Sequence, residues 1–125
     1  MNTPIHTPNA PAAIGPYSQA VQASNLVFVS GQLPINPATG AFAGEDIAAQ
    51  TRQSLTNVRN ILEAAGYSLS DVVKTTVLLA EIADFGAMNV VYEELFGDTK
   101  PARAAFAVKD LPKGALVEIE AVACK

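Results

Sequence analysis

The segment KPARAAFAV, residues 100–108, sets a single arginine among small and apolar side chains. Side chains of a strand alternate between its faces, so Arg103 and Ala105 are expected on one face and Phe106 on the other. A buried guanidinium needs hydrogen-bonding partners, and no acidic residue lies within four positions of Arg103. Its partner must therefore come from elsewhere in the fold or from a ligand.

Two glutamates near the end of the sequence could supply that partner. In LVEIEAVAC, residues 116–124, Glu118 and Glu120 share one side of an expected strand, about 7 Å apart at ~3.4 Å per residue. Carboxylates in an apolar strand need a cation or hydrogen bonds, and Arg103 on a nearby strand is the candidate. The pattern alone favours a structural ion pair at a sheet edge or interface, because such networks are common there.

Polar residues also interrupt the segments IGPYSQ and VSGQLP, residues 14–19 and 29–34. A Gly-Pro pair fixes the chain before Tyr17, which indicates either a turn with a half-buried aromatic or a hydroxyl that serves as a polar tip in a site. The Ser30-Gly31 pair breaks an apolar strand, which indicates either a β-bulge or a backbone group open to a ligand. No histidine accompanies Ser30, so a Ser-His-Asp nucleophile is not expected.

Composition excludes several classes of chemistry. The 125 residues have the length of one domain and include one histidine, His6, and one cysteine, Cys124. This count rules out an internal disulfide and argues against a metal site. The net charge of −4 disfavours binding to a nucleic-acid backbone. Glycine-rich nucleotide-binding loops and a G-x-S-x-G nucleophile elbow are absent from the sequence.

Half of the residues are hydrophobic and 16% are charged, an apolar balance that indicates a subunit interface. No apolar run reaches the ~18 residues that a membrane-spanning helix requires. Residues 1–15 show neither a basic start nor a compact apolar segment. We therefore expect no membrane association and no secretory signal, and we expect a cytoplasmic location.

Hydrophobic periodicity predicts five strands and two helices after an irregular or extended lead over residues 1–16. The strands are expected over residues 17–23, 26–32, 72–79, 103–108 and 116–124, and the helices over residues 46–65 and 84–96. Strands 26–32 and 72–79 flank the longer helix, which predicts a right-handed crossover between parallel neighbours. The expected α+β fold is an open mixed sheet with both helices on one face. The other face stays bare unless a partner covers it.

Turn and cap residues support these boundaries. The Ser24-Asn25 pair suits a tight connection between the first two strands, and Gly66 suits the end of the longer helix. Asp84 is the expected N-cap of the second helix, and Gly97 its expected end.

Four segments in order, IGPYSQA, VSGQLP, PARAAFAVKDLP and VEIEAVA, resemble the Rid family of YjgF-like enamine/imine deaminases. The resemblance runs from about residue 8 to the last residue, and the PAR…LP…VEIE stretch matches the family signature in residues and spacing. It implies a single domain over residues 1–125 with a chorismate-mutase-like mixed sheet and two helices on one face. It also implies a homotrimer around the sheets, with a ligand cleft between neighbouring subunits.

The resemblance further implies an activity and a ligand class. Its deaminase branch hydrolyses reactive 2-enamine and 2-imino acids, of the 2-aminoacrylate and 2-iminopropionate type, to 2-keto acids and ammonia. This is a metabolite damage-control role that uses neither a metal nor an organic cofactor. Two alternatives stay open: a non-catalytic sensor of small carboxylates such as keto acids, and RNA cleavage, which the acidic charge opposes.

The family's catalytic residues fall on four positions of this sequence. Its arginine falls on Arg103, which would bind the substrate carboxylate, and its acid falls on Glu118, which would handle the water. Tyr17 and Ser30 match polar residues of the family site, which would steer the substrate and the carbinolamine intermediate.

Three further positions are implied to bind substrate. Gly31 matches a backbone contact, and Asn89 matches a residue that lines the cleft. Ala105 stands where the family often has a cysteine that acts mainly through its main chain, so its side chain is not expected to matter for deamination.

The expected mechanism needs few groups. Arg103 would hold the carboxylate with two parallel N–H···O bonds, a geometry that lysine cannot reproduce. Glu118 would act as a general base and then pass a proton to departing ammonia, while Glu120 would be structural. We expect Arg103 and Glu118 to line one wall of the cleft, and Tyr17 to be the first candidate for a contact from the adjacent chain.

Overall fold

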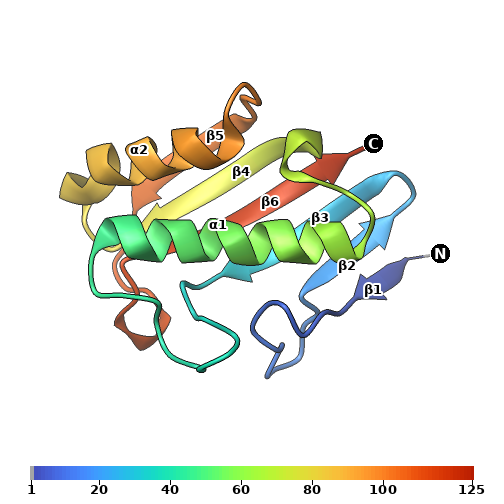
Figure 1. The fold of residues 1–125 in the computed structure, drawn as a ribbon, viewed down its shortest axis with the longest axis horizontal. Helices are drawn as coiled ribbons and strands as arrows, with labels where there is room; N and C mark the ends of the chain where they lie inside the picture. Colours follow the sequence, from blue (N-terminus) through green and yellow to red (C-terminus); the bar gives the residue numbers. More distant parts are fainter. Residues whose placement is uncertain (1) are drawn as a thin grey trace.

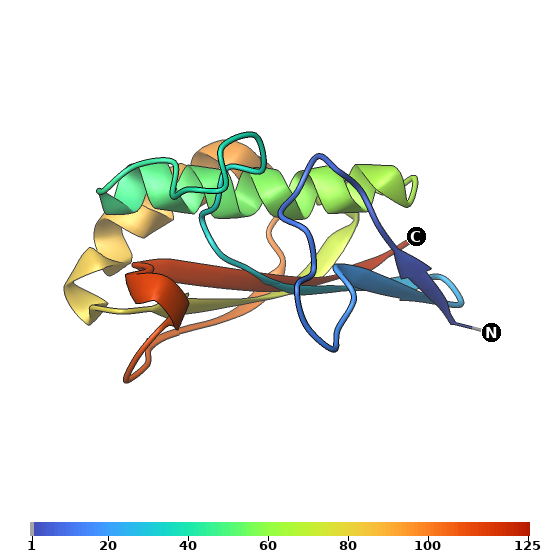
Figure 2. The same ribbon diagram turned by 90° about the horizontal axis from the view of Figure 1, so that it is seen from below.

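The computed structural model describes residues 2–125, and Met1, the first residue of the expected lead, lies outside them. The strands are β1 Thr3–Ile5, β2 Ala20–Ala23, β3 Leu26–Gln32, β4 Val72–Leu79, β5 Ala102–Ala107 and β6 Val117–Cys124, and the helices are α1 Ile47–Ala64 and α2 Phe85–Phe96. The strands form one mixed sheet in the order β1-β2-β3-β6-β4-β5. Both helices lie on one face of this sheet, as the sequence predicted (Figure 1, Figure 2).

Helix α1 lies within one residue of its predicted bounds. The Asp46 side chain caps it by accepting a hydrogen bond from the Ala49 amide at 2.7 Å, a contact that stabilises a helix by about 1 kcal/mol. Leu55 and Leu62 lie on its fully buried stripe. The helix ends before Gly66, which takes a positive φ of 81° that favours glycine.

Helix α2 begins one residue after Asp84, whose side chain makes no capping hydrogen bond. The predicted N-cap therefore has the right place but does not form the expected contact. Gly97 ends the helix as predicted, with φ of 59° and its amide donating to the Glu93 carbonyl at 2.9 Å.

The order of the strands corrects one prediction. Strands β3 and β4 have their predicted bounds but are not neighbours, because β6 lies between them and pairs antiparallel with both. The parallel neighbours are β4 and β5, which α2 connects. The apolar odd-numbered residues of β6 decide which of its faces is buried. They do not decide which strands lie beside it, so the pattern of the chain between β3 and β4 could not reveal the insertion.

The lead contains a strand that the sequence pattern did not reveal. β1 pairs antiparallel with β2 at the edge of the sheet, and β2 is shorter than predicted, starting at Ala20 rather than Tyr17. The buried Gln19 amide holds the lead in place, accepting from the Thr7 amide at 2.7 Å and donating to the Pro11 carbonyl at 2.8 Å. A single glutamine that satisfies distant backbone groups leaves no periodic signal.

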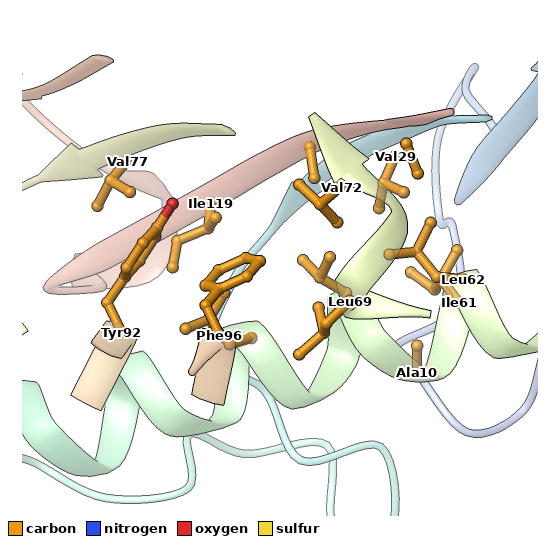
Figure 3. Close-up of a cluster of buried hydrophobic side chains, with 14 of the residues drawn as sticks. Ala10, Val29, Ile61, Leu62, Leu69, Val72, Val77, Tyr92, Phe96 and Ile119 are labelled. Carbon is orange, nitrogen blue, oxygen red and sulfur yellow. The ribbon is translucent and has the colours of Figure 1, made fainter. Parts of the chain in front are cut away.

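The core lies between the sheet and the helices. Four residues of β6 face it, and each is at most 3% exposed: Val117, Ile119, Ala121 and Ala123. Figure 3 shows Tyr92 and Phe96 reaching from α2 toward the strands that carry Val77 and Ile119. Burying an aliphatic side chain fully stabilises folding by about 1.5–3 kcal/mol, so this layer fixes which face of each strand points outward.

Neither α1 nor α2 covers the opposite face of the sheet (Figure 2). Phe28 is 46% exposed there and pairs with the partly exposed Val122, and Leu78, farther along the same face, is also partly exposed. The bare apolar face that the sequence predicted is therefore present.

Neither α1 nor any other helix within residues 2–125 is long and apolar enough to cross a membrane.

Candidate functional site

A cleft of about 480 Å³ opens on the bare face of the sheet. It is lined by Tyr17, Ser30, Gly31, Leu33, Pro112, Glu118 and Glu120. Four of the seven site residues expected from the sequence are thus brought together by the β1–β2 connection, β3 and β6. Parts of the β1–β2 and β5–β6 connections extend beyond the sheet on this face (Figure 2).

Gly31 allows the Glu118 carboxyl to lie directly against β3. A Cβ built on Gly31 would overlap the Glu118 Oε2 atom. The pairing of β3 with β6 shifts register between Val29 and Gln32, so the Ser30-Gly31 pair forms the irregularity that the sequence indicated. The missing side chain and the bulge together create the space for the carboxyl.

The Glu118 carboxyl binds its proton more tightly than an ordinary glutamate does. Burial raises its pKa above the usual 4.5, and the nearby charge of Glu120 raises it further. An acid in this state suits proton transfer near neutral pH better than an exposed carboxylate does.

Ser30 and Tyr17 belong to one small structural unit. The Ser30 hydroxyl donates to the Ser18 carbonyl at 2.6 Å, and the Ser30 amide donates to the Gln19 carbonyl at 2.9 Å. These bonds fix the segment that carries Tyr17, whose side chain is 53% exposed at the cleft. The Ser30 hydroxyl is therefore a support for the Tyr17 segment in this chain.

A second cleft, of about 490 Å³, lies where α2 meets β5, and Arg103, Asn89, Tyr92 and Lys100 are among its lining residues. The Arg103 Nη1 donates to the Asn89 Oδ1 at 2.6 Å. Its Cζ lies 4.8 Å from the centroid of the Tyr92 ring and 5.4 Å from that of Phe85. Aromatic rings at these distances attract a guanidinium without neutralising it.

The prediction that Arg103 pairs with the glutamates is wrong within this chain. Arg103 pairs in register with Thr75, whose side chain is buried under α2, whereas Glu118 pairs with Leu78 on the bare face. Alternation along β4 puts Thr75 and Leu78 on opposite faces. β4 also separates β5 from β6 by roughly 10 Å at ~4.8 Å per strand. Arg103 and Glu118 therefore do not share a wall of one cleft.

The remaining expected residues lie on the Arg103 side. Asn89 lines the second cleft, as the resemblance implied, although its carbonyl oxygen is taken by Arg103. Ala105 pairs in register with Val77 and shares the face of β5 that Arg103 occupies. The seven expected residues thus form two groups: Tyr17, Ser30, Gly31 and Glu118 on the bare face, and Arg103, Asn89 and Ala105 at the β5 edge.

Phe85 and Tyr92, whose rings lie beside Arg103, were not among the site residues expected from the sequence. Their spacing carried the missing signal, because residues 85, 89 and 92 fall on one helical face. An asparagine between two aromatic residues on that face suits a guanidinium. Elsewhere, no three His, Cys, Asp or Glu side chains within residues 2–125 converge as metal ligands would.

Comparison with known proteins places the whole fold in one family. The family model described as Endoribonuclease L-PSP matches residues 7–125. A RutC family protein of Pyrococcus horikoshii is 57% identical over 100% of this chain and 99% of its own length. The 2-iminobutanoate/2-iminopropanoate deaminase of Salmonella typhimurium is 50% identical over 100% of this chain and 99% of its own length.

A solved structure has the same architecture. The crystal structure of Escherichia coli TdcF with bound serine has a TM-score of 0.95 and 42% sequence identity, and the match covers 98% of each chain. The mixed sheet with two helices on one face is thus shared with a known protein.

Proposed function

Since this chain belongs to the Endoribonuclease L-PSP family, the family of the RutC and YjgF proteins, we propose that it hydrolyses reactive 2-enamine and 2-imino acids to 2-keto acids and ammonia. Relatives that are about half identical to it are named 2-iminobutanoate/2-iminopropanoate deaminase. Family membership confirms the resemblance seen in the sequence. The activity is proposed from that membership together with the chemistry of the two clefts.

The observation that carries the proposal is that the Arg103 guanidinium has no carboxylate partner among residues 2–125. Its guanidinium is partly buried, yet the described residues offer it one amide oxygen and two aromatic rings but no carboxylate. Such a cation retains N–H donors for an anionic ligand, and the planar fork matches a carboxylate. The serine bound to TdcF is itself a small carboxylate, which supports a ligand of this class.

Assembly supplies the second half of the proposed site. Arg103 and Glu118 lie on opposite faces of one sheet, too far apart for one small 2-imino acid to touch both in a single chain. In a closed ring each contact is head-to-tail, so the β5 edge of one chain can meet the bare face of the next. We propose a homotrimer in which Arg103, Asn89 and Ala105 of one chain face Tyr17, Ser30, Gly31 and Glu118 of its neighbour.

In the proposed reaction, Arg103 binds the carboxylate of the 2-imino acid and so fixes the imine carbon beside a water at Glu118. Glu118 accepts a proton as the water oxygen bonds to the imine carbon, and the C=N electron pair moves to nitrogen, which takes up that proton. The product of this step is a carbinolamine. A second transfer through Glu118 moves the hydroxyl proton to the amine, the C–N bond breaks, and a keto acid and ammonia leave.

The other groups position the reactants. Gly31 leaves space for the carboxyl, Ser30 supports the segment that carries Tyr17, and the Tyr17 hydroxyl can hold the carbinolamine oxygen. Imines hydrolyse in water without help, so orientation and one proton shuttle suffice for a useful acceleration. All these roles belong to side chains or backbone of the chain itself.

RNA cleavage, which the description of the family model raises, receives less support. The bare-face cleft is lined by two carboxylates, Glu118 and Glu120, and the chain has a net charge of −4. Both features repel a phosphate backbone.

A direct assay tests the proposed function. An amino-acid oxidase generates imines from alanine, leucine and phenylalanine, and semicarbazide traps what remains with time. We expect the imine of alanine to disappear faster when the protein is present. Equal decay with and without protein, combined with binding of the keto acid, would replace the deaminase by a keto-acid sensor.

A further inference from the structure

The Arg103 guanidinium takes its surroundings from a single face of α2. Asn89 accepts its one hydrogen bond within the described chain, at 2.6 Å, and Phe85 and Tyr92 contribute their rings. A carboxylate partner would compete with an incoming anion for the same donors. A ring beneath the guanidinium restrains its plane and leaves its edge and charge available.

Tyr92 has a contact that Phe85 lacks. Its hydroxyl and the Thr75 Oγ1 lie 2.7 Å apart, and Thr75 is the residue of β4 that pairs in register with Arg103. Tyr92 is 8% exposed and Thr75 is fully buried. Figure 3 shows the Tyr92 ring extending from α2 toward the sheet. The hydroxyl contact therefore fixes the ring to the strand beside the one that carries Arg103.

From this geometry we propose that Tyr92 is a positioning residue for carboxylate recognition. Its ring, anchored to β4 through Thr75, holds the Arg103 guanidinium in the plane that a two-point carboxylate contact requires. Arginine has a long side chain with several rotatable bonds, and a bidentate contact forms only when the plane of the fork is fixed. The inference rests on the proposed function for the identity of the ligand, a small 2-imino or 2-keto acid.

The experiment compares a carboxylate ligand with its neutral counterpart. Dissociation constants of 2-oxobutanoate and of 2-oxobutanamide are measured by NMR titration, and their ratio defines the carboxylate preference. We expect Tyr92→Leu to lower this preference by about ten-fold, the scale of a lost cation–π contact together with a less ordered arginine. Tyr92→Phe keeps the ring and should lose less, by roughly two- to three-fold.

Tyr67 provides a matched control. It is also a buried tyrosine, 7% exposed, and its hydroxyl donates to the Asn25 carbonyl at 2.9 Å in the turn between β2 and β3. Tyr67→Leu should lower stability as Tyr92→Leu does and leave the carboxylate preference unchanged. If Tyr92→Leu does not fold, Thr75→Val removes only the anchor and should lower the preference as much as Tyr92→Phe does.

A double-mutant cycle separates positioning from general packing. In an Arg103→Ala background, Tyr92→Leu should change the preference by less than about two-fold, because the group through which it acts is gone. If Tyr92→Leu weakens both ligands equally, or has its full effect without Arg103, the positioning role is overturned. A wild-type protein with no carboxylate preference would overturn it as well.

The binding experiment tests the positioning role of Tyr92 whether or not the protein is a deaminase. A protein that prefers the carboxylate through Tyr92 and Arg103 but does not accelerate imine decay supports the positioning role and rejects the deaminase. Accelerated imine decay with an unchanged preference in Tyr92→Leu supports the deaminase and rejects the positioning role.

Discussion

Two charged groups of this chain, Glu118 on the bare face of the sheet and Arg103 at its β5 edge, are kept reactive in different ways. Glu118 lies against the backbone at Gly31 with a second carboxyl nearby, and burial raises its pKa. Arg103 lies beside two aromatic rings and one amide, with no carboxylate among the described residues. Among residues 2–125, neither group forms a salt bridge with a charge of opposite sign, so each remains available to a ligand.

The different surroundings of Arg103 and Glu118 suit the different roles proposed for them. The arginine needs a fixed orientation and constant charge, which rings and an amide provide. As the proposed base, the glutamate needs a proton affinity above that of an exposed carboxylate, which burial and a like charge provide. In the proposed site each region is incomplete alone, so a substitution can disturb one region and leave the other intact.

The largest effect is expected from Glu118→Gln, which removes the proposed base and leaves its shape. Turnover of the alanine-derived imine should fall by about 10³-fold, within the range of general acid–base catalysis. Keto-acid binding should change little. Glu120→Gln is the matched control and should retain most turnover, and equal losses in the two variants would show that the role of base was assigned to the wrong glutamate.

Arg103→Lys should lower kcat/KM by about 100-fold while the fold is retained. Lysine keeps the charge and loses the two parallel hydrogen bonds to the carboxylate. Steady-state kinetics on the same imine measures the loss, and circular dichroism checks the fold. Near-normal turnover in the folded variant would remove Arg103 from its proposed role.

Gly31→Ala should lower turnover by roughly ten-fold or more, because the new Cβ displaces the Glu118 carboxyl. Gly86 in α2 provides the control, since a Cβ there meets no atom within 4 Å. Gly86→Ala should retain activity and fold at least as well as the wild type. Unchanged turnover in Gly31→Ala would mean that the close approach of Glu118 to β3 is irrelevant to catalysis.

Mixing inactive variants tests whether the Arg103 region and the Glu118 region of one cleft come from different chains. Chains with Arg103→Ala and chains with Glu118→Gln are refolded together in equal amounts. About a quarter of the shared clefts should then combine an intact Arg103 from one chain with an intact Glu118 from its neighbour, and activity should return. A mixture of Glu118→Gln with Tyr17→Ala should recover nothing, because both residues line the same cleft of one chain. Recovery in neither mixture, despite proven mixed trimers, would reject the shared cleft, and a monomer in sedimentation would reject it too.

The smallest effect concerns stability. Because the pKa of Glu118 is raised in the folded state by burial and then by Glu120, its stabilising contribution is full below pH 4.5 and decreases as pH rises through the raised value. Urea unfolding should therefore show Glu118→Gln gaining stability relative to wild type between pH 4 and pH 7. The acid limb of the wild-type pH–rate profile should likewise lie above pH 4.5, and Glu120→Gln should shift it downward.

Periodicity and punctuation in the sequence determined most of the elements. The alternation in VEIEAVAC fixed which side of β6 is buried, and the caps and glycines placed α1 and α2 within one residue. The motif segments identified the family, which the comparisons confirm. These features are local, because each depends on neighbours within a few residues along the chain.

Only the tertiary structure decided which residues meet. The registers of β5 and β6 on β4 put Arg103 and Glu118 on opposite faces, although β3 and β4 have their predicted bounds and β5 and β6 lie within one residue of theirs. The rings of α2 beside Arg103, the glutamine that holds the lead and the space at Gly31 likewise join segments far apart in sequence. Such contacts follow from strand order and from burial on both faces of the sheet, and the period of a single strand contains no information about its neighbours.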